Sequence, residues 1–307
     1  MSTSLSDTSA SEINKALSDV RRAHGGLTAG HVMTLIMITD GHGNGPEVQS
    51  TCRTAGEHPS RILVVRRHPN ETCVGLDAEV FGAGERGPGE LVILDLSGEL
   101  AWHAESVVVP LLIPDTPVVT FWPGNGPDDP SADPLGRLSQ RRITDLAAGD
   151  DAPGRLAARA AHYTDGDTDL AWTRLTLWRS VLATALDDVY SHPTGGVVAA
   201  EPGNASAELL AMWLSARLGI PVQREESTGP GLTEVRLSLP DGEVTLRRTD
   251  GRLAMLSSPG HHERPIALKR RDLSELINEE LRRLDADDIY AECLATIRET
   301  ETREGAQ

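Results

Sequence analysis

Aromatic residues are scarce in this 307-residue sequence, where phenylalanine, tryptophan and tyrosine together make up 3% of the chain. A core must therefore consist mainly of leucine, valine, isoleucine and alanine. The apolar fraction of 39% is typical of a globular protein and argues against a disordered one. The length leaves room for two domains of ordinary size.

Positive charge is also in deficit: 29 lysines and arginines face 46 aspartates and glutamates, a formal net charge of −17. Nucleic acids and anionic membranes would repel such a chain, so neither is expected as a partner. Long apolar runs that could span a membrane are missing, and so are the basic and apolar regions of a secretion signal. These absences predict a cytoplasmic protein.

The chain has three cysteines, Cys52, Cys73 and Cys293, and none of them belongs to a CxxC motif. Their odd number and wide spacing are typical of free thiols in a reducing compartment, while a redox pair of Cys52 and Cys73 remains an alternative. The short run His261–Glu263 lacks the helical HExxH spacing of a zinc site. The sequence therefore predicts no metal site.

Apolar runs at 31–40 and 60–67 are nearly continuous, which is typical of strands buried on both faces. Helices are expected at 9–24, 46–57 and 101–112, and further strands at 76–84, 90–98 and 117–124. Ser9 and Glu12 have the spacing of a capping box for the first helix. This alternation predicts an α/β domain over residues 1–124, with an open, mostly parallel sheet flanked by helices.

The character of the chain changes over residues 125–190, which combine a loop rich in proline and aspartate with a helical segment. A second α/β pattern occupies residues 191–307. It has a strand, a helix, several short alternating strands and two terminal helices, at 272–284 and 287–299. The pattern predicts a smaller domain with a mixed sheet and C-terminal helices.

The loop DGHGNGP (40–46) follows a predicted strand and precedes a helix, where phosphate-binding loops occur. Gly41 and Gly43 fit a dinucleotide fingerprint, but Pro46 stands where the third glycine belongs. The acidic residue expected about 20 positions later is also missing, and Arg66 lies in that region instead. A nucleotide carrying a 2′-phosphate and a plain surface loop are both compatible with this pattern.

Cationic residues near the predicted sheet edge could form an anion pocket; they are His58, Arg61, Arg66, Arg67, His68, Arg141 and Arg142. Ordinary charge pairing in an acidic chain is the alternative. The sequence has no GxSxG motif and no distinct set of serine, histidine and aspartate. We therefore predict no catalytic residue.

The segment 167–187 carries two of the five tryptophans. Trp172, Leu175, Trp178 and Leu182 recur every three or four residues, so they share one face of a predicted helix that Asp167 or Thr168 would cap. The face suits burial against a sheet. It also suits an interface, because tryptophan and arginine are enriched in binding hot spots.

The same segment, DTDLAWTRLTLWRSVLATALD, closely resembles the signature helix of the OpcA family, the glucose-6-phosphate dehydrogenase assembly and activator proteins, in its actinobacterial form. Further matching segments keep their order from about residue 9 to residue 294, among them INKALSDVRRAHGG, EHPSRILVV, DPLGRLSQRRITD and ALKRRDLSELINEELRRLDADDIYA. One departure is Leu177, which stands where the family usually has proline. The resemblance covers nearly the whole chain.

The resemblance implies that the protein is not an enzyme, needs no cofactor, and binds glucose-6-phosphate dehydrogenase as an assembly factor or allosteric activator. It would thereby support NADPH supply by the oxidative pentose phosphate pathway. The partner-binding residues expected on this basis, as apolar anchors and matching charges, are Asp169, Trp172, Arg174, Trp178, Arg179, Arg141 and Arg142.

The alternative is a sensor or enzyme that binds NADP or a sugar phosphate through the Gly41–Gly45 loop. Its binding residues would be Gly41, Gly43, His58, Arg61 and Arg66.

Overall fold

The computed structural model describes residues 2–23, 31–39, 45–54, 57–82, 89–124, 126–148, 151–248 and 250–304. The chain divides into two compact units. Unit 1 comprises Met1–Asp145, Thr164–Thr168 and Asp272–Ala286, and unit 2 comprises Leu146–Tyr163, Asp169–Arg271 and Asp287–Gln307. Each unit has its own hydrophobic core.

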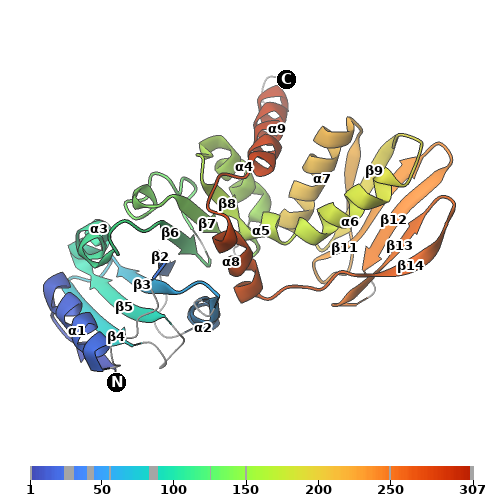
Figure 1. Cartoon of the computed structure of the whole chain (residues 1–307). Coiled ribbons are helices and arrows are strands. Elements are labelled where there is room, and N and C mark those ends of the chain that lie inside the picture. Colours follow the sequence, from blue (N-terminus) through green and yellow to red (C-terminus); the bar gives the residue numbers. More distant parts are fainter. Residues whose placement is uncertain are drawn as a thin grey trace. The chain divides into compact units, whose positions relative to one another are not determined.

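An eight-stranded sheet with the order β1-β4-β5-β3-β2-β6-β7-β8 is the centre of unit 1 (Figure 1). Its strands are β1 (Thr3–Leu5), β2 (Met33–Thr39), β3 (Ser60–His68), β4 (Gly75–Phe81), β5 (Glu90–Ser97), β6 (Val118–Trp122), β7 (Arg141–Thr144) and β8 (Asp167–Asp169). The strands from β5 to β7 pair in parallel, whereas β4 and β1 pair antiparallel at one edge. The predicted open, mostly parallel sheet is confirmed.

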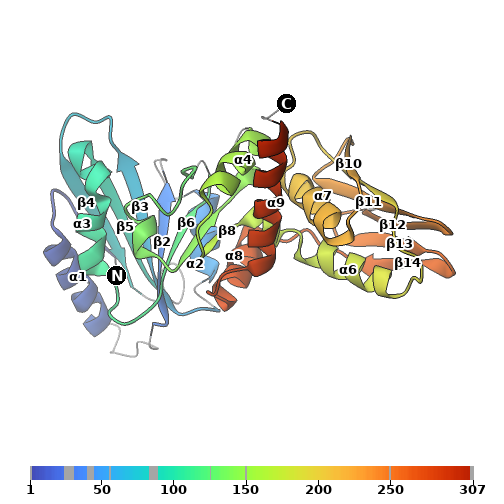
Figure 2. The same cartoon turned by 90° about the horizontal axis from the view of Figure 1, so that it is seen from above.

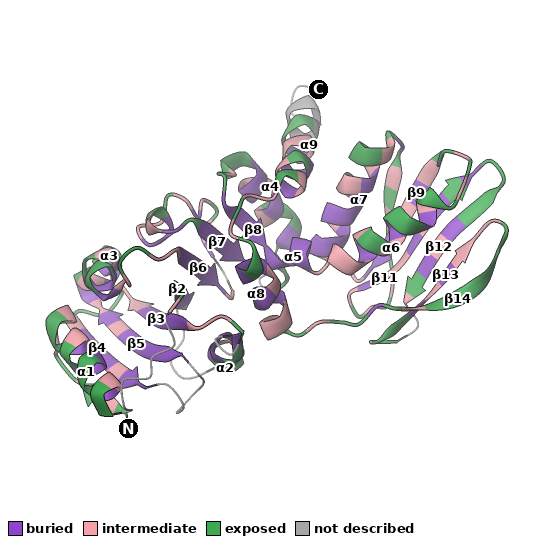
Figure 3. Ribbon diagram, viewed as in Figure 1, coloured by how far each residue is buried: buried purple, intermediate pink, exposed green. Residues whose placement is uncertain are grey.

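Helices cover both faces of this sheet, which explains why the apolar runs of β2 and β3 are continuous (Figure 3). The helices of unit 1 are α1 (Ala10–Ala23), α2 (Pro46–Thr54), α3 (Ala104–Val108) and α8 (Leu273–Arg282). Ile13 and Leu17 of α1 share a core with Ile36 and Leu63 of the sheet. On the opposite face, the hydroxyl of Thr51 in α2 lies 3.4 Å from the sulfur of Met37.

The capping box predicted at the start of α1 is confirmed. The backbone amide of Ser9 donates to Glu12 Oε2 at 3.0 Å, and the amide of Glu12 donates to Ser9 Oγ at 3.3 Å. The single helix predicted over 101–112 is wrong, because α3 is flanked by two 3-10 turns, Gly98–His103 and Val109–Leu111. Pro110 lacks an amide hydrogen, so α3 cannot continue through it.

Unit 2 contains a six-stranded sheet with the order β10-β9-β11-β12-β13-β14. The strands are β9 (Gly195–Ala200), β10 (Val222–Glu226), β11 (Leu232–Leu239), β12 (Gly242–Arg248), β13 (Leu253–Ser258) and β14 (His261–Ala267). Only the β9–β10 pair is parallel; the other pairs are antiparallel. The predicted smaller mixed sheet is confirmed, and the run His261–Glu263 forms the start of β14.

The helices of unit 2 are α4 (Ala152–His162), α5 (Leu170–Thr173), α6 (Thr176–Asp187), α7 (Ala205–Leu218) and α9 (Asp288–Glu304). Helix α7 connects the parallel strands β9 and β10 and lies with α6 on one face of the sheet (Figure 2). Helix α9 contacts α4 and α7. No helix in the described part of the chain is long and apolar enough to cross a bilayer.

The segment 167–187 is not the single helix that its apolar period predicts. It consists of β8, the short helix α5 and then α6. The cap is Asp169, whose carboxylate accepts a hydrogen bond of 2.8 Å from the amide of Ala171. Asp167 and Thr168, the predicted caps, belong to β8.

Two of the three cysteines, Cys52 and Cys293, are buried, whereas Cys73 is exposed; all three are free thiols. Burial in the core of unit 2 raises the pKa of the Cys293 thiol to about 12. A thiolate is the reactive form, so Cys293 is inert at neutral pH.

We therefore expect Ellman's reagent at pH 8 to modify one thiol of the native protein rapidly, and all three thiols after denaturation. The fast phase should disappear in Cys73→Ser, because only Cys73 is accessible to the reagent. A fast phase of two thiols, or one that persists in Cys73→Ser, would contradict the burial of Cys52 and Cys293.

Candidate functional site

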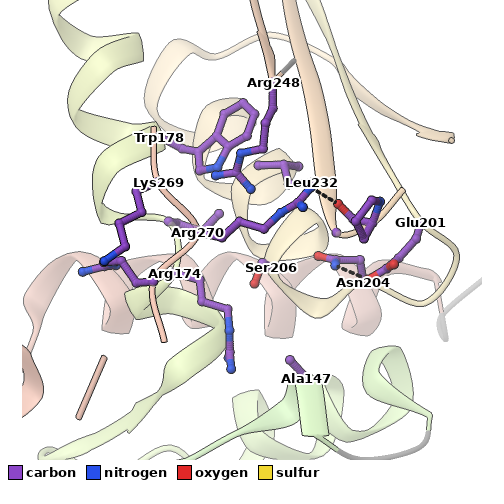
Figure 4. Close-up of a pocket in the computed structure, with 14 residues that line it drawn as sticks. Ala147, Arg174, Trp178, Glu201, Asn204, Ser206, Leu232, Arg248, Lys269 and Arg270 are labelled. Atoms are coloured by element: carbon purple, nitrogen blue, oxygen red, sulfur yellow. Dashed lines mark hydrogen bonds between the residues drawn. The ribbon is translucent and has the colours of Figure 1, made fainter. Parts of the chain in front are cut away.

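A pocket of about 240 Å³ opens in unit 2 at the carboxyl end of β9, beside the start of α7 (Figure 4). The residues Glu201–Asn204 connect the strand to the helix, so the pocket belongs to the β9–α7–β10 connection. In sheets with parallel strands, ligands commonly bind outside the carboxyl ends of those strands. All residues that line the pocket belong to unit 2.

Cationic side chains dominate the lining of this pocket. They are Arg174, Arg248, Lys269, Arg270 and Arg271, and Glu201 is the one acidic residue among the described residues that line it. Arg174 follows α5, Arg248 ends β12, and the run 269–271 follows β14. The lining of this pocket thus carries a local excess of positive charge, whereas the chain as a whole has a net charge of −17.

Hydrogen bonds and a contact with an aromatic ring position several of these cationic side chains. Arg270 donates a hydrogen bond of 2.6 Å to the carbonyl oxygen of Pro230, and Arg271 donates to the carbonyl oxygen of Thr173. The guanidinium of Arg248 lies over the ring of Trp178, 4.9 Å from its centroid. These contacts place Arg248 and Arg270 around the same opening (Figure 4).

The pocket lining also contains polar groups that are not cationic. Asn204 caps α7, since its Oδ1 accepts a bond of 3.0 Å from the amide of Ala207, and its Nδ2 lies 3.3 Å from Oε1 of Glu201. The hydroxyl of Ser206 donates to the carbonyl oxygen of Ala171 at 2.8 Å. The Glu201 carboxylate remains an acceptor for hydroxyl groups.

Burial, together with the positive charge of Arg270, lowers the pKa of Arg248 to about 10. No carboxylate in the described part of the chain forms an ion pair with Arg248, and its buried Nε atom has no hydrogen-bond partner there. Two neighbouring cations in a partly enclosed space attract an anion strongly. The pocket is therefore suited to anion binding.

The residues predicted to contact a partner lie mostly inside the molecule. Trp172 and Trp178 are 1% and 2% exposed and belong to the core of unit 2. The indole of Trp172 donates to Asp287 at 2.9 Å, and the guanidinium of Arg179 lies 3.7 Å from its ring centroid. The tryptophans are thus not available as surface anchors in this structure, and a role in partner binding stays a prediction.

Asp169 is fully buried, and its carboxylate also accepts a bond of 3.1 Å from the amide of Leu146. Arg174 and Arg179 are half-buried, and of these two Arg174 lines the pocket. The structure therefore brings Arg174 and Trp178 together at the pocket, while Asp169 holds the start of α5.

Arg141 and Arg142 belong to unit 1, where β7 places both side chains inside the fold. Arg141 donates to Glu280 of α8 at 2.5 Å. Arg142 donates to Asp167 of β8 at 2.5 Å. Both arginines hold neighbouring elements of unit 1 together, and charge matching with a partner stays a prediction for them.

The anion pocket expected from His58, Arg61 and Arg66 does not form as a single site. Arg61 and Arg66 lie near opposite ends of β3, roughly 16 Å apart at the usual rise of a strand. Arg61 pairs with Glu90 at 3.0 Å and Arg66 with Asp95 at 3.2 Å. Gly41 and Gly43 lie outside the described residues.

A second cavity, of about 250 Å³, lies at the carboxyl ends of β2 and β6 in unit 1. Ile38, Arg67, Trp122 and Asp133 are among the residues that line it. Arg67 is neutralised there by Asp133 at 2.7 Å. Among the described residues of the whole chain, no group of three or more histidine, cysteine, aspartate or glutamate side chains is arranged to hold a metal ion.

Two family models match the chain in order, and both describe a glucose-6-phosphate dehydrogenase subunit. The model of the N-terminal domain matches residues 52–161, and the model of the C-terminal domain matches residues 165–294. No curated protein matches the sequence.

Solved structures that match include a Gfo/Idh/MocA family oxidoreductase from Vibrio cholerae, with 10% identity and a TM-score of 0.40 over 90% of this chain and 100% of that one. Biliverdin reductase from Synechocystis, in complex with biliverdin and NADP+, matches with 9% identity and a TM-score of 0.43 over 87% and 96% of the two chains. Likenesses at these TM-scores carry no argument about function. The two family models together cover most of the sequence, and the chain belongs to the OpcA family of glucose-6-phosphate dehydrogenase subunits.

Proposed function

We propose that this chain is a non-catalytic assembly factor and activator of glucose-6-phosphate dehydrogenase, and that it supports NADPH supply through the oxidative pentose phosphate pathway. The observation that carries the proposal is the match to both domain models of a glucose-6-phosphate dehydrogenase subunit, over residues 52–161 and 165–294. The matched residues include the whole segment 167–187. An activator works by contacting the active state of its partner more favourably than the inactive state, so it needs no nucleophile of its own.

The segment 167–187 supports a structural part in this role. Trp172 and Trp178 hold α5 and α6 in the core of unit 2, and the link between these helices presents Arg174 at the pocket. In this proposal the two tryptophans do not contact the partner; from the core of unit 2 they position α5, α6 and Arg174, which form part of the partner-binding surface.

The test is the rate of NADPH formation by the cognate glucose-6-phosphate dehydrogenase, at dilute enzyme, with and without this chain. We expect a rise of about fivefold or more, the lower end of ordinary allosteric coupling. Size-exclusion chromatography with mass determination should show a heavier species that contains both proteins. The chain alone, given glucose 6-phosphate and NADP+, should form no NADPH.

The variants Arg174→Ala and Arg217→Ala make a matched pair for the same assay. Arg174 lies in the segment 167–187 and lines the pocket, whereas Arg217 is exposed near the end of α7, does not line the pocket and pairs with Glu292 at 2.8 Å. Activation should fall in the first variant only. No rate change and no complex with the unmodified chain would refute the proposed function, whereas equal activation by both variants would remove Arg174 from the partner-binding residues.

A further inference from the structure

The pocket at the carboxyl end of β9 has more cationic than acidic side chains in its lining. Among the described residues, five cationic side chains line it against one carboxylate, that of Glu201. Glu201 lies next to Asn204, at the start of α7. The 14-residue helix α7 adds the partial positive charge of its N-terminus on the same side.

Few contacts in the structure stabilise the positive charge of Arg248. Its guanidinium is packed on Trp178, its Nε atom is buried without a hydrogen-bond partner, and no described carboxylate pairs with it. The charge of Arg270 acts on it unfavourably. A half-buried cation beside a second cation opposes folding, and proteins keep such costs mainly at sites that bind or react.

We propose that this pocket binds a small phosphorylated sugar, with the phosphate between Arg248 and Arg270 and the sugar hydroxyl groups toward Glu201 and Asn204. Guanidinium groups present paired N–H donors that match phosphate oxygens. The carboxylate of Glu201 accepts hydrogen bonds from hydroxyl groups, and a sugar offers several of these beyond its phosphate, whereas inorganic phosphate has only the protons on its own oxygens. The ligand thus needs both an anionic and a hydroxylated part.

The size of the pocket limits the ligand further. Its volume of about 240 Å³ is below the roughly 300–1,000 Å³ of pockets for drug-sized ligands, so a dinucleotide is too large to be enclosed. The site is in unit 2 and is separate from the Gly41–Gly45 loop. It also does not depend on the proposed activation of the dehydrogenase, because binding can be measured on this chain alone.

The first test is isothermal titration of the full chain, at low ionic strength, with glucose 6-phosphate, inorganic phosphate and glucose. Glucose 6-phosphate should bind at one site per chain, inorganic phosphate at least about tenfold more weakly, and glucose not detectably. No heat with millimolar glucose 6-phosphate would overturn the proposal. Equal affinity for inorganic phosphate would also overturn it, because the hydroxyl contacts would then be absent.

The second test compares Arg248→Met with Arg247→Met, which remove the same charge from neighbouring positions of β12. Arg247 is exposed and lies 3.8 Å from Glu263, outside the pocket. Arg248→Met should weaken glucose 6-phosphate binding about tenfold to hundredfold, the usual effect of losing a hydrogen bond to a charged group. Arg247→Met should bind as the unmodified chain does.

The melting temperature distinguishes a ligand-binding role of Arg248 from a role in stabilising the fold. Without ligand, Arg248→Met should melt at the same temperature as the unmodified chain or higher, because it removes a cation that Arg270 repels. Saturating glucose 6-phosphate should raise the melting temperature of the unmodified chain and of Arg247→Met, but not that of Arg248→Met. If Arg248→Met and Arg270→Met both fold and both keep full affinity, the proposal is wrong.

Discussion

Replacing Trp172 by alanine is expected to lower the free energy of unfolding of unit 2 by about 3–5 kcal/mol. The indole is 1% exposed and lies 5.6 Å, centroid to centroid, from the ring of Tyr290 in α9. The guanidinium of Arg179 stacks over the indole ring, and the indole N–H donates a hydrogen bond to Asp287. The substitution leaves a cavity and removes the hydrogen bond to Oδ2 of Asp287, while Oδ1 of Asp287 still accepts from the amides of Ile289 and Tyr290.

Urea denaturation followed by circular dichroism measures this effect, with two comparison variants. Trp172→Phe keeps most of the apolar contact and loses the bond to the Asp287 carboxylate, so it should cost about 1.5–3 kcal/mol for that bond plus a smaller packing loss. Trp102→Ala removes a tryptophan that is 66% exposed and should change stability by less than about 0.5 kcal/mol. Equal losses for Trp172→Ala and Trp102→Ala would contradict the packing described for unit 2.

Glu90→Gln is expected to destabilise unit 1 by about 3–5 kcal/mol. The side chain at the start of β5 is buried, and its carboxylate accepts a hydrogen bond of 3.0 Å from each of Arg21 and Arg61. Neutralising it leaves two cations without their counter-charge, and the charge of Arg61 is almost fully buried. Glu99→Gln, at an exposed position, provides the matched control and should have little effect.

The same residue makes unit 1 sensitive to acid. Burial alone would raise the pKa of Glu90, but the hydrogen bond from Arg21 and the charges of Arg61 and Arg21 outweigh it and hold the pKa below its ordinary value. A carboxyl with a lowered folded-state pKa contributes stability above its unfolded pKa, about 4.3, and loses it as the pH falls through the folded pKa. Stability measured from pH 7 down to pH 3 should therefore fall less steeply in Glu90→Gln than in the unmodified chain.

Local signals in the sequence were enough to predict the parts of the fold that local physics decides. The runs at 31–40 and 60–67 are apolar at nearly every position, and they became β2 and β3 at the centre of the parallel sheet. The capping box at Ser9 depends on residues only three positions apart. Patterns of this kind need no knowledge of distant contacts.

The interruption of the segment 167–187 could not be predicted in this way. Asp169 is held by the amide of Leu146, 23 positions earlier, and Trp172 by Asp287, 115 positions later. These long-range hydrogen bonds determine where β8 ends and α5 begins. The spacing of apolar residues along the sequence carries no information about them. The same period left burial and interface as alternatives, and burial is what the structure shows for Trp172 and Trp178.

The cationic pocket cannot be predicted from the sequence, for a related reason. Its positive residues come from three places, the α5–α6 link, the end of β12 and the segment after β14, which only the folding of unit 2 brings together. The run KRR at 269–271 was the one signal in the sequence, since three adjacent cations are unusual in so acidic a chain. By itself it gave no reason to expect Arg174 or Arg248 beside it.

The way in which the chain is divided between the two units also constrains truncation of the protein and its folding during synthesis. Unit 1 begins with the first residues of the chain, yet it includes Asp272–Ala286, where α8 supplies the partner of Arg141. A truncated protein that ends anywhere before residue 272 therefore lacks a helix of unit 1 as well as part of unit 2. Domains tend to form on the ribosome in the order of their synthesis, but unit 1 cannot complete its fold until residues 272–286 have been synthesised, after most of unit 2.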